Sequence, residues 1–256
     1  MSRVEVHMFP CLNDNYGFLV HSPDSGVTAA VDTPEVEPIL GALADTGWTL
    51  TYIWNTHHHG DHAGGNLPVK AATGCRIIGP RADAARIPGI DIEVGEGDRF
   101  DFGGHEVEVF DTPGHTRGHI VYLLRKERLA FVGDTLFSMG CGRLFEGSPA
   151  QMWASLGKIL AWPDDTRLYC AHEYTQANAR FALSVEPANA ALVERAAEVE
   201  RLREQGVPTV PTSLALEKAT NPFLRPASRN LRATIGLPNA DDVAVFARTR
   251  ALKDAF

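Results

Sequence analysis

The segment that most constrains this chain is THHHGDHAGG, residues 56–65, which follows the apolar run TLTYIW. Four of the chain's ten histidines, and one aspartate, lie within residues 57–62. Imidazole nitrogens combined with carboxylate oxygens suit zinc, manganese or iron, and no thiolate is needed. The alternative is a run of solvated or core histidines, which so high a local density of imidazoles disfavours. The segment therefore predicts a metal site at the end of a strand.

The spacing inside this segment predicts how it folds. His57 and His59 are two residues apart, so both side chains project to the same side of an extended segment. Gly60 then allows a sharp turn, from which Asp61 and His62 can converge. The glycine pair that follows leaves room for a helix to start close to the site. We expect a strand, a ligand loop and a helix in succession.

Further candidate ligands lie where other apolar runs end. FDTPGHTRGH presents His115, FVGDT presents Asp134, and YCAHEY presents His172. Active-site groups commonly gather on loops at such strand ends. We expect two ions about 3.5 to 4 Å apart that share one water. The first ion would take His57, His59 and His115, the second Asp61, His62 and His172, and Asp134 would place one oxygen on each.

Two histidines near these ligands are interpreted as structural. His58 lies between two ligands and should point away from the ions. His119 could orient a ligand, as residues behind metal ligands often do, but a structural role is favoured for it as well.

Short β-rich runs broken by turn residues continue to about Ala171. The patterns predict helices over residues 34–44, 66–72 and 149–161, the last after a Ser148 cap. Strand clusters with interspersed helices indicate an α/β (α+β) protein of layered sheets covered by helices.

The sequence pattern changes after Glu173, where the segment ANAALVERAAEVERLREQG has helical periodicity. We therefore expect two domains, residues 1–172 with the sheets and residues 173–256 mostly helical. Residues 223–256 carry six basic and three acidic side chains in a chain of net charge -8, which makes this end a candidate anion site. A solvated helix face is the alternative.

Composition disfavours several classes of partner. The net charge of -8 opposes a non-specific grip on nucleic acid, which needs Lys and Arg. The four cysteines lie far apart and include no C-x-x-C pair, which disfavours both a thiolate zinc site and a disulfide scaffold. We therefore expect Cys11, Cys75, Cys141 and Cys170 to be reduced thiols. No segment has the pattern of a signal peptide or a membrane span. The expectation is a cytoplasmic monomer that binds neither nucleic acid nor membranes.

Several segments resemble the metallo-β-lactamase superfamily, namely THHHGDHAGGN, TPGHTRGH, GDTLF and AHEYT. More narrowly, the chain is similar to the hydroxyacylglutathione hydrolases, or glyoxalase II, in LNDNYGFLV, GCGRLFEG, AHEYTQAN, VEPAN, NPFLR and RALKD, which run nearly end to end. The resemblance implies a four-layer αββα sandwich and a dinuclear site between the sheet ends. It also implies a C-terminal helical domain that holds glutathione.

The resemblance also implies substrate contacts. Arg250 and Lys253 match basic positions that contact the glutathione carboxylate, and Tyr174 matches a substrate-contacting tyrosine. Arg143 lies where the family usually has a basic residue. Phe145 occupies a position that is often tyrosine, so a hydroxyl contact would be lost, which would affect affinity more than chemistry.

The implied reaction is hydrolysis of S-(2-hydroxyacyl)glutathione, chiefly S-D-lactoylglutathione, to glutathione and D-lactate, the second step of methylglyoxal detoxification. A water bridging two divalent ions, zinc or else iron or manganese, would lose its proton near neutral pH and attack the thioester. Asp61 would orient the attacking oxygen while it binds a metal, beside the shared carboxylate of Asp134, and one metal would stabilise the oxyanion. A thiolate leaves without a strong general acid.

Three other readings remain open. A two-metal phosphodiesterase or nuclease would use the same ligands, although it would be expected to carry a basic surface. A persulfide dioxygenase is a relative with a single iron, whereas seven ligands favour two ions. A non-catalytic protein would bind metal only as a clamp, but a closed structural site leaves no open position for water.

Overall fold

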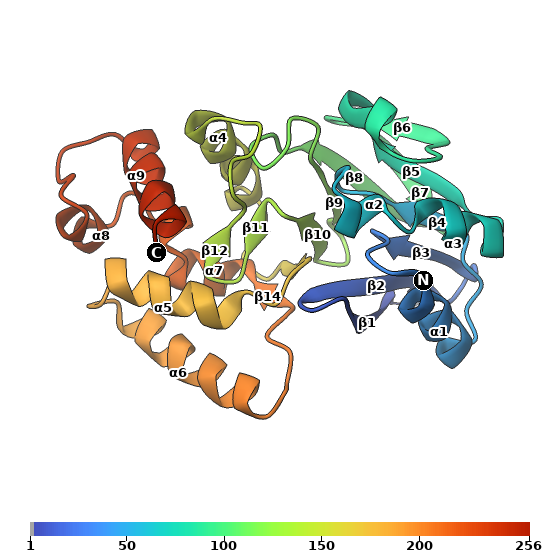
Figure 1. Ribbon diagram of the computed structural model, residues 1–256, viewed down its shortest axis with the longest axis horizontal. Coiled ribbons are helices and arrows are strands. Elements are labelled where there is room, and N and C mark those ends of the chain that lie inside the picture. The colour runs from blue at the N-terminus through green and yellow to red at the C-terminus, as the bar shows by residue number, and fades with distance from the viewer. Residues whose placement is uncertain (1–2) are drawn as a thin grey trace. The chain divides into compact units, whose positions relative to one another are not determined.

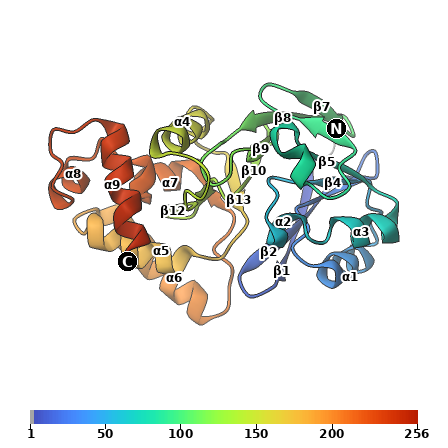
Figure 2. The same cartoon turned by 45° about the horizontal axis from the view of Figure 1, so that its top comes forward.

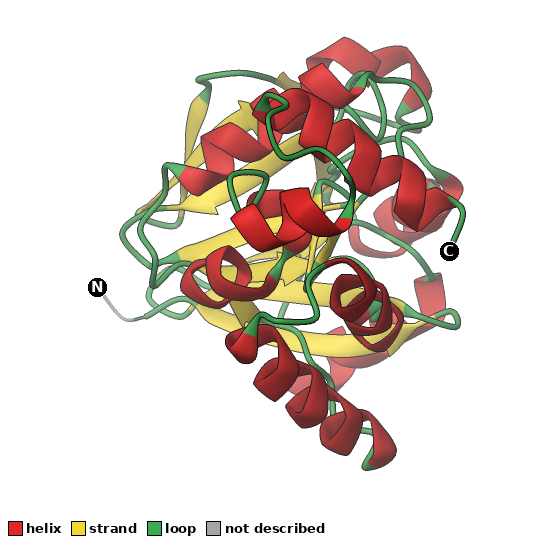
Figure 3. Ribbon diagram, turned by 90° about the vertical axis from the view of Figure 1, so that its left-hand side faces the viewer, coloured by secondary structure: helices red, strands yellow, loops and turns green. Residues whose placement is uncertain are grey.

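The computed structural model describes residues 3–256, which divide into two compact units (Figure 1). Unit 1 takes the chain up to Asp111 together with Arg117–Gly133. Unit 2 takes Thr112–Thr116 together with Asp134–Phe256. Unit 1 contains most of the strands and unit 2 most of the helices. Figure 3 shows the strands in yellow and the helices in red. The segment 112–116, which contains His115, therefore interrupts unit 1 in the sequence.

The first sheet of unit 1 has its strands in chain order from β1 to β6. They are β1 (Glu5–Cys11), β2 (Asn15–Ser22), β3 (Val27–Val31), β4 (Tyr52–Trp54), β5 (Arg76–Pro80) and β6 (Ile92–Val94). The first three pair antiparallel, and β3 to β6 pair parallel. Parallel neighbours need crossover connections. Helices on the three crossovers provide them: α1 (Val36–Thr46), α2 (Gly60–Ala63) with α3 (Asn66–Thr73), and the 3-10 helix η1 (Arg81–Arg86).

Helices α1 and α3 lie side by side over one face of this sheet (Figure 2). Their apolar side chains, among them Ile39 and Val69, join Leu19, Ile53 and Ile77 of the strands in one buried cluster. Burying one such side chain contributes roughly 1.5 to 3 kcal/mol. The packing fixes the direction in which β4 delivers the histidine segment.

The second sheet of unit 1 contains β7 (Arg99–Phe102), β8 (His105–Asp111), β9 (Ile120–Leu124) and β10 (Leu129–Gly133), all antiparallel. It packs against the other face of the first sheet through aromatic rings. Trp54 of β4 has ring centroids 4.8 Å from Phe102 and 5.4 Å from Tyr122, and Phe18 lies 5.8 Å from Phe131. Unit 1 is thus a helix layer on two stacked sheets.

Unit 2 contains the hairpin β11 (Leu136–Phe137) and β12 (Gly140–Cys141), the pair β13 (Arg167–Cys170) and β14 (Thr212–Ser213), and most of the helices. These are α4 (Pro149–Leu160), α5 (Thr175–Val185), α6 (Ala190–Glu204), α7 (Leu214–Thr220), η2 (Pro222–Leu224), α8 (Arg229–Thr234) and α9 (Asp242–Asp254). Helices α5 and α6 pack side by side (Figure 1). Helix α9 packs on α4.

Local signals placed the longer elements well. Ser148 accepts from the Gln151 N–H in a capping box at the start of α4, and Pro149 is its first residue, as predicted. Helix α1 runs two residues later than predicted, because Glu35 is still extended and Gly47 ends the helix in the left-handed region at φ 70°. The short strands β6, β7, β11, β12 and β14 have two to four residues each and were not predicted. The predicted mixture of sheets and helices is confirmed.

All four cysteines are buried and none forms a disulfide. Across residues 3–256, no helix combines the length and apolarity that a bilayer crossing requires.

Candidate metal centre

The histidine segment brings four of the predicted ligands together within unit 1. The ring nitrogens His57 Nε2 and His59 Nδ1 lie 3.1 Å apart, so the two side chains face the same side as predicted. The ring centroids of His57 and His62 are 4.0 Å apart, and His62 Nε2 lies 3.4 Å from Asp61 Oδ2. Gly60 opens α2 and is not in the left-handed region, so an ordinary helical turn brings Asp61 and His62 round.

Asp32, just after β3, fixes the orientation of this segment and was missed by the sequence analysis. Its Oδ1 accepts from the Thr56 N–H at 2.8 Å, and its Oδ2 lies 2.8 Å from both Thr56 Oγ1 and His62 Nδ1. Thr56 Oγ1 in turn lies 3.0 Å from His57 Nδ1. Because both Nδ1 atoms face these partners, the Nε2 atoms of His57 and His62 point into the cluster, as metal-ligating histidines require.

The backbone of Asp32 supports the same conclusion. Its φ is 59°, in the left-handed region, which a residue other than glycine enters at a cost of about 1 kcal/mol or more. Asp32 is 5% exposed. Its carboxylate accepts from the backbone N–H and the hydroxyl of Thr56, and it faces the imidazole of His62. The sequence did offer a signal for this role, because Asp32 lies in the motif VDT, directly after an apolar run.

Neutral polar side chains hold the rest of the loop. Asn55 Nδ2 donates to the His62 carbonyl at 3.0 Å, and Asn66 Nδ2 donates to Asn55 Oδ1 at 2.7 Å. Thr33 donates its hydroxyl to Asn66 Oδ1 at 2.7 Å. Tyr122 of the second sheet donates to the Asn55 carbonyl at 2.8 Å. All are buried, so this loop is fixed from both sheets of unit 1.

His58 and His119 lie beside the ligands without joining them. His58 turns away, with Nδ1 at 3.1 Å from Asp83 Oδ2 and Nε2 at 3.1 Å from Arg86 Nη1. His119 stacks on His57, with ring centroids 4.8 Å apart. The predicted orientation of His58 is confirmed.

Unit 2 brings together the other three predicted ligands. His115 Nε2 lies 3.4 Å from Asp134 Oδ2, and His172 Nε2 lies 3.4 Å from Asp134 Oδ1. The side chains are 4 to 8% exposed. One carboxylate therefore presents a different oxygen to each imidazole, as a shared metal ligand would. His115 Nδ1 donates to the Arg143 carbonyl at 2.9 Å, which directs Nε2 toward Asp134.

Glycine is required beside this carboxylate. A Cβ on Gly142 would lie 2.0 Å from the Asp134 carbonyl oxygen and 3.2 Å from His115 Nδ1. The segment GCGR can follow the ligands this closely only without a side chain at that position.

Two aromatic residues adjoin the ligands of unit 2. Tyr174 stacks on His172, with ring centroids 4.6 Å apart and planes at 3°, and is 37% exposed. The Phe145 ring lies 5.2 Å from the His115 ring and is 63% exposed. Both offer an accessible aromatic face next to a candidate ligand.

The three basic residues predicted to contact substrate have different surroundings. Arg250 is 5% exposed and donates to the Cys141 carbonyl at 2.8 Å and to Asp254 at 2.9 Å, so it holds the end of β12. Lys253 Nζ donates to the Ala177 carbonyl at 3.3 Å, and burial, followed by Arg250 and Arg143, lowers the pKa of its ammonium. The Arg143 side chain is 67% exposed.

The donor types fit a divalent metal. Unit 1 gathers three imidazoles and a carboxylate, and unit 2 places a buried carboxylate between two imidazoles. Burying a carboxylate costs several kcal/mol unless a cation or hydrogen bonds compensate. Imidazole and carboxylate are ligands that zinc, iron and manganese accept. The chain thus has the side chains for a metal cofactor.

Comparison with known proteins agrees with this chemistry. The family model described as the metallo-beta-lactamase superfamily matches residues 24–172, and that of the hydroxyacylglutathione hydrolase C-terminus matches residues 173–256. The chain is 57% identical to a hydroxyacylglutathione hydrolase of Maricaulis maris and 54% identical to one of Rhizobium meliloti, each over 100% of both chains.

Solved structures show the same fold. The crystal structure of ETHE1 from Myxococcus xanthus superposes with a TM-score of 0.67 at 25% identity, over 98% of this chain and 99% of that one. BLEG-1, a B3 metallo-beta-lactamase, gives 0.66 at 21% identity, over 86% of this chain and 100% of that one. With its layered sheets, its helical C-terminal region and its full-length relatives, the chain belongs to the hydroxyacylglutathione hydrolase family of the metallo-β-lactamase superfamily.

Proposed function

We propose that this chain hydrolyses S-(2-hydroxyacyl)glutathione, chiefly S-D-lactoylglutathione, to glutathione and a 2-hydroxy acid. The observation that carries the proposal is identity of 57% and 54% to hydroxyacylglutathione hydrolases over the whole chain. The substrate is a small anionic thioester. We also propose that the metal is zinc and that the protein acts as a cytoplasmic monomer. In this proposal it binds neither nucleic acid nor membranes.

The proposed site uses both groups of ligands to hold two divalent ions, zinc or else iron or manganese. His57, His59 and His115 would hold the first, Asp61, His62 and His172 the second, and Asp134 would be shared. When bound, two such ions would lower the pKa of a coordinated water toward neutral pH and would stabilise negative charge on the substrate oxygen.

The chain's own side chains orient the reaction. Asp61 is held by Asn15, whose Nδ2 lies 3.2 Å from Asp61 Oδ2 and 3.3 Å from its carbonyl oxygen. The Asp61 carboxylate is 38% exposed, so it could accept a hydrogen bond that orients the attacking oxygen while Asn15 holds the side chain in place. Asp32 and Thr56 keep the imidazoles aimed, which spares reorganisation during the reaction.

We assign residues 1–172 to the catalytic domain and residues 173–256 to the domain that binds glutathione. Tyr174 offers an exposed ring beside His172, and the Lys253 ammonium and the Arg143 guanidinium offer positive charge for the glutathione carboxylates. Arg250 would contribute chiefly by holding the β12 backbone, to which it already donates, and by its charge.

The test is steady-state hydrolysis of S-D-lactoylglutathione, followed by loss of thioester absorbance, before and after chelation. Turnover should disappear on chelation and return with zinc, iron or manganese, and the order of recovery identifies the metals accepted. A chromogenic phosphodiester assayed in parallel should be hydrolysed far more slowly. Full thioesterase activity in the metal-stripped protein would refute the mechanism, and faster phosphodiester hydrolysis would favour a nuclease.

A further inference from the structure

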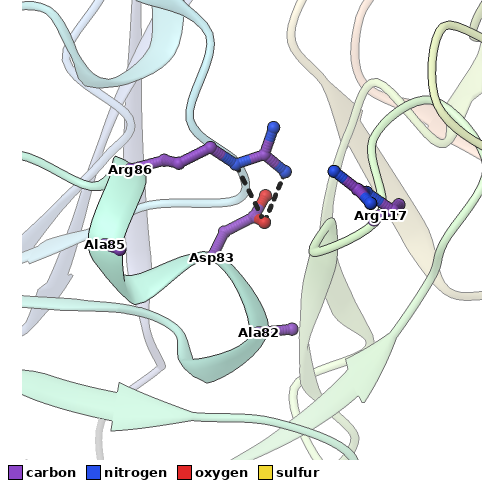
Figure 4. A pocket seen from close by; sticks show the side chains of 5 residues that line it. All are labelled: Ala82, Asp83, Ala85, Arg86 and Arg117. Carbon is purple, nitrogen blue, oxygen red and sulfur yellow. Dashed lines mark hydrogen bonds and ion pairs between the residues drawn. The ribbon is translucent and has the colours of Figure 1, made fainter.

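Each unit contains a buried polar cluster that adjoins the candidate ligands. In unit 1, Asp83 is 3% exposed, accepts from Arg86 Nε at 3.2 Å and lies 3.1 Å from His58 Nδ1, beside a small pocket (Figure 4). A Cβ on Gly118 would lie 2.2 Å from its carboxyl carbon. This cluster reaches the histidine segment only through His58, which is not a candidate ligand. The cluster in unit 2 instead contacts the hairpin of β11 and β12, which follows Asp134 in the chain.

The hairpin of β11 and β12 is too short to define its own position. Each strand has two residues, and the register pairs Leu136 with Cys141 and Phe137 with Gly140. An isolated two-stranded hairpin is at best marginally stable. Met139 in its turn has a φ of 54°, in the left-handed region that residues other than glycine enter at a cost. Contacts from outside the hairpin must therefore hold it in place.

Three buried side chains of unit 2 make such contacts, and we call them the hairpin clamp: Asn178, Glu217 and Asn221. Asn221, at the end of α7, donates from Nδ2 to the Phe137 carbonyl at 3.1 Å and to the Gly140 carbonyl at 2.9 Å. Glu217 of α7 accepts from the Met139 N–H at 2.8 Å through Oε2. The same oxygen lies 3.0 Å from Asn221 Nδ2, so the two clamp residues of α7 also hold each other.

Helix α5 completes the clamp from another direction. Asn178 Nδ2 donates to the Ser138 carbonyl at 3.1 Å. A Cβ on Gly140 would lie 2.4 Å from this nitrogen, so the hairpin approaches Asn178 as closely as glycine alone permits. The Met139 side chain is fully buried in an apolar cluster with residues of α5 and α6, among them Ala182. The backbone of four consecutive residues, 137–140, is thus bound by side chains from two helices.

Both ends of the hairpin carry parts of the candidate metal centre. Asp134 lies two residues before β11, and Arg143 lies two residues after β12. The Arg143 carbonyl accepts from His115 Nδ1 at 2.9 Å. A shift of the hairpin would therefore move a candidate ligand and the acceptor that directs a second one. Distances in a well-formed metal site vary by only about 0.2 Å, so even a small shift would weaken binding.

We propose that the hairpin clamp positions the unit 2 part of the metal centre, because it fixes the hairpin and thereby the places of Asp134 and of the Arg143 carbonyl. The inference rests on the proposed function, in which Asp134 and His115 are metal ligands. The clamp residues act through the hairpin and are positioning residues. Their substitution should therefore lower metal affinity and kcat. The KM for the thioester should change little, since the side chains proposed to bind glutathione are not part of the clamp.

The test compares the zinc-loaded wild type with Asn221→Ser by competition with a chromogenic chelator and by steady-state hydrolysis of S-D-lactoylglutathione. Asn221 Oδ1 also caps η2 by accepting from the Phe223 N–H at 3.0 Å. Serine can keep this cap but cannot donate to both hairpin carbonyls. We expect zinc affinity to fall by about 10- to 100-fold, the range typical of residues behind metal ligands, and kcat to fall with it.

Asn189→Ser is the matched control. Asn189 likewise caps a helix, α6, by accepting from the Leu192 N–H at 3.2 Å, and its Nδ2 donates to the Ala219 carbonyl at 2.9 Å. Both amide nitrogens also contact a buried glutamate. The control should lower Tm comparably but bind zinc and turn over as the wild type does. Equal zinc affinity in the Asn221→Ser and Asn189→Ser proteins, with both folded by thermal melting, would overturn the inference.

A milder variant keeps the inference testable if Asn221→Ser does not fold. Asn178→Ala removes the bond to the Ser138 carbonyl and leaves α7 intact. Because one hydrogen bond is lost, zinc affinity should fall by about three- to tenfold. Unchanged zinc affinity in this protein would then overturn the inference.

Asp134→Ala, measured in the same chelator competition, separates the two proposals. If it loses zinc while Asn221→Ser keeps wild-type affinity, the clamp inference fails and the proposed ligands stand. If Asp134→Ala itself binds zinc as tightly as the wild type, the proposed ligand set is wrong and the inference falls with it.

Discussion

The two groups of candidate ligands are built in different ways. In unit 1 four ligands come from six consecutive residues and share one network, in which Asp32 contacts Thr56 and His62. In unit 2 three ligands come from three distant segments, and Asp134 contacts both of the others. The ligands of a contiguous motif are oriented by a residue from elsewhere in the chain, here Asp32. Ligands from distant segments are positioned by the fold and by their contacts with one another.

Asp134 contacts both other candidate ligands of unit 2, so its substitution should have the largest effect. Asp134→Ala should lower kcat/KM for S-D-lactoylglutathione by about 1,000-fold or more, because a ligand shared by the two proposed ions would support both, and each ion would provide several kcal/mol. Metal content should fall in parallel, measured by elemental analysis. Asp164→Ala, an exposed carboxylate in the same unit, is the control. Wild-type activity in Asp134→Ala would show that the unit 2 ligands are not used.

Asp32 is the corresponding test for unit 1. Asp32→Ala leaves all seven candidate ligands in place but removes the acceptor that orients His57, through Thr56, and His62. We expect metal affinity and activity to fall by about 10- to 100-fold, the effect typical of residues behind metal ligands. Asp32→Asn, which keeps one oxygen, should fall less. If Asp32→Ala binds metal as tightly as the wild type, the histidine segment is rigid without its network.

A buried ion pair in unit 2 tests whether its helical part is stabilised by charge. Glu186 is fully buried and accepts from Arg225 Nε and Nη2, each at 2.9 Å, and from Ser228. Burial by itself raises the pKa of this carboxyl, but the bonds from Arg225 and Ser228 outweigh it, so the pKa is lowered from 4.5.

The sign follows from the lowered pKa. The stabilisation is complete above the unfolded-state pKa and is lost as pH falls through the folded-state pKa. Glu186→Gln should therefore reduce the free energy of unfolding by about 1 to 3 kcal/mol at neutral pH, with the difference from wild type shrinking in acid. Urea unfolding of both proteins, from neutral pH down into the acid range, measures this difference in the free energy of unfolding. A difference that grows on acidification would show that the charge is destabilising.

Lys253 tests the substrate-binding role of unit 2 and should give the smallest effect. Lys253→Met keeps an unbranched side chain but removes the ammonium, whose Nζ lies 5.3 Å from the centroid of the Phe181 ring. Loss of one charge contact should raise KM by about tenfold and leave kcat nearly unchanged, as expected for binding that is equal in ground and transition states. Lys218→Met, which breaks an exposed pair with Asp164, is the control. A fall in kcat with unchanged KM would place Lys253 in the chemistry instead.

Local sequence patterns predicted much of this molecule. The alternation of His57 and His59 correctly predicted that they face the same side, and the Ser148 signal correctly placed the start of α4. Both depend on backbone geometry over a few residues, which is the same in any fold. Apolar runs before His115, Asp134 and His172 likewise marked strand ends without a structure.

The tertiary structure decided what depends on residues distant in the chain. Asp32 reaches Thr56 across 24 positions, Arg250 reaches the Cys141 carbonyl across 109, and Gly118 meets Asp83. No periodicity or spacing encodes such pairs, because the partners are brought together by sheet packing and helix docking. The sequence by itself determined which side chains could hold a metal and which segments carry them. Only the folded chain decided which groups orient those ligands, and that the guanidinium of Arg250 donates to the Cys141 carbonyl.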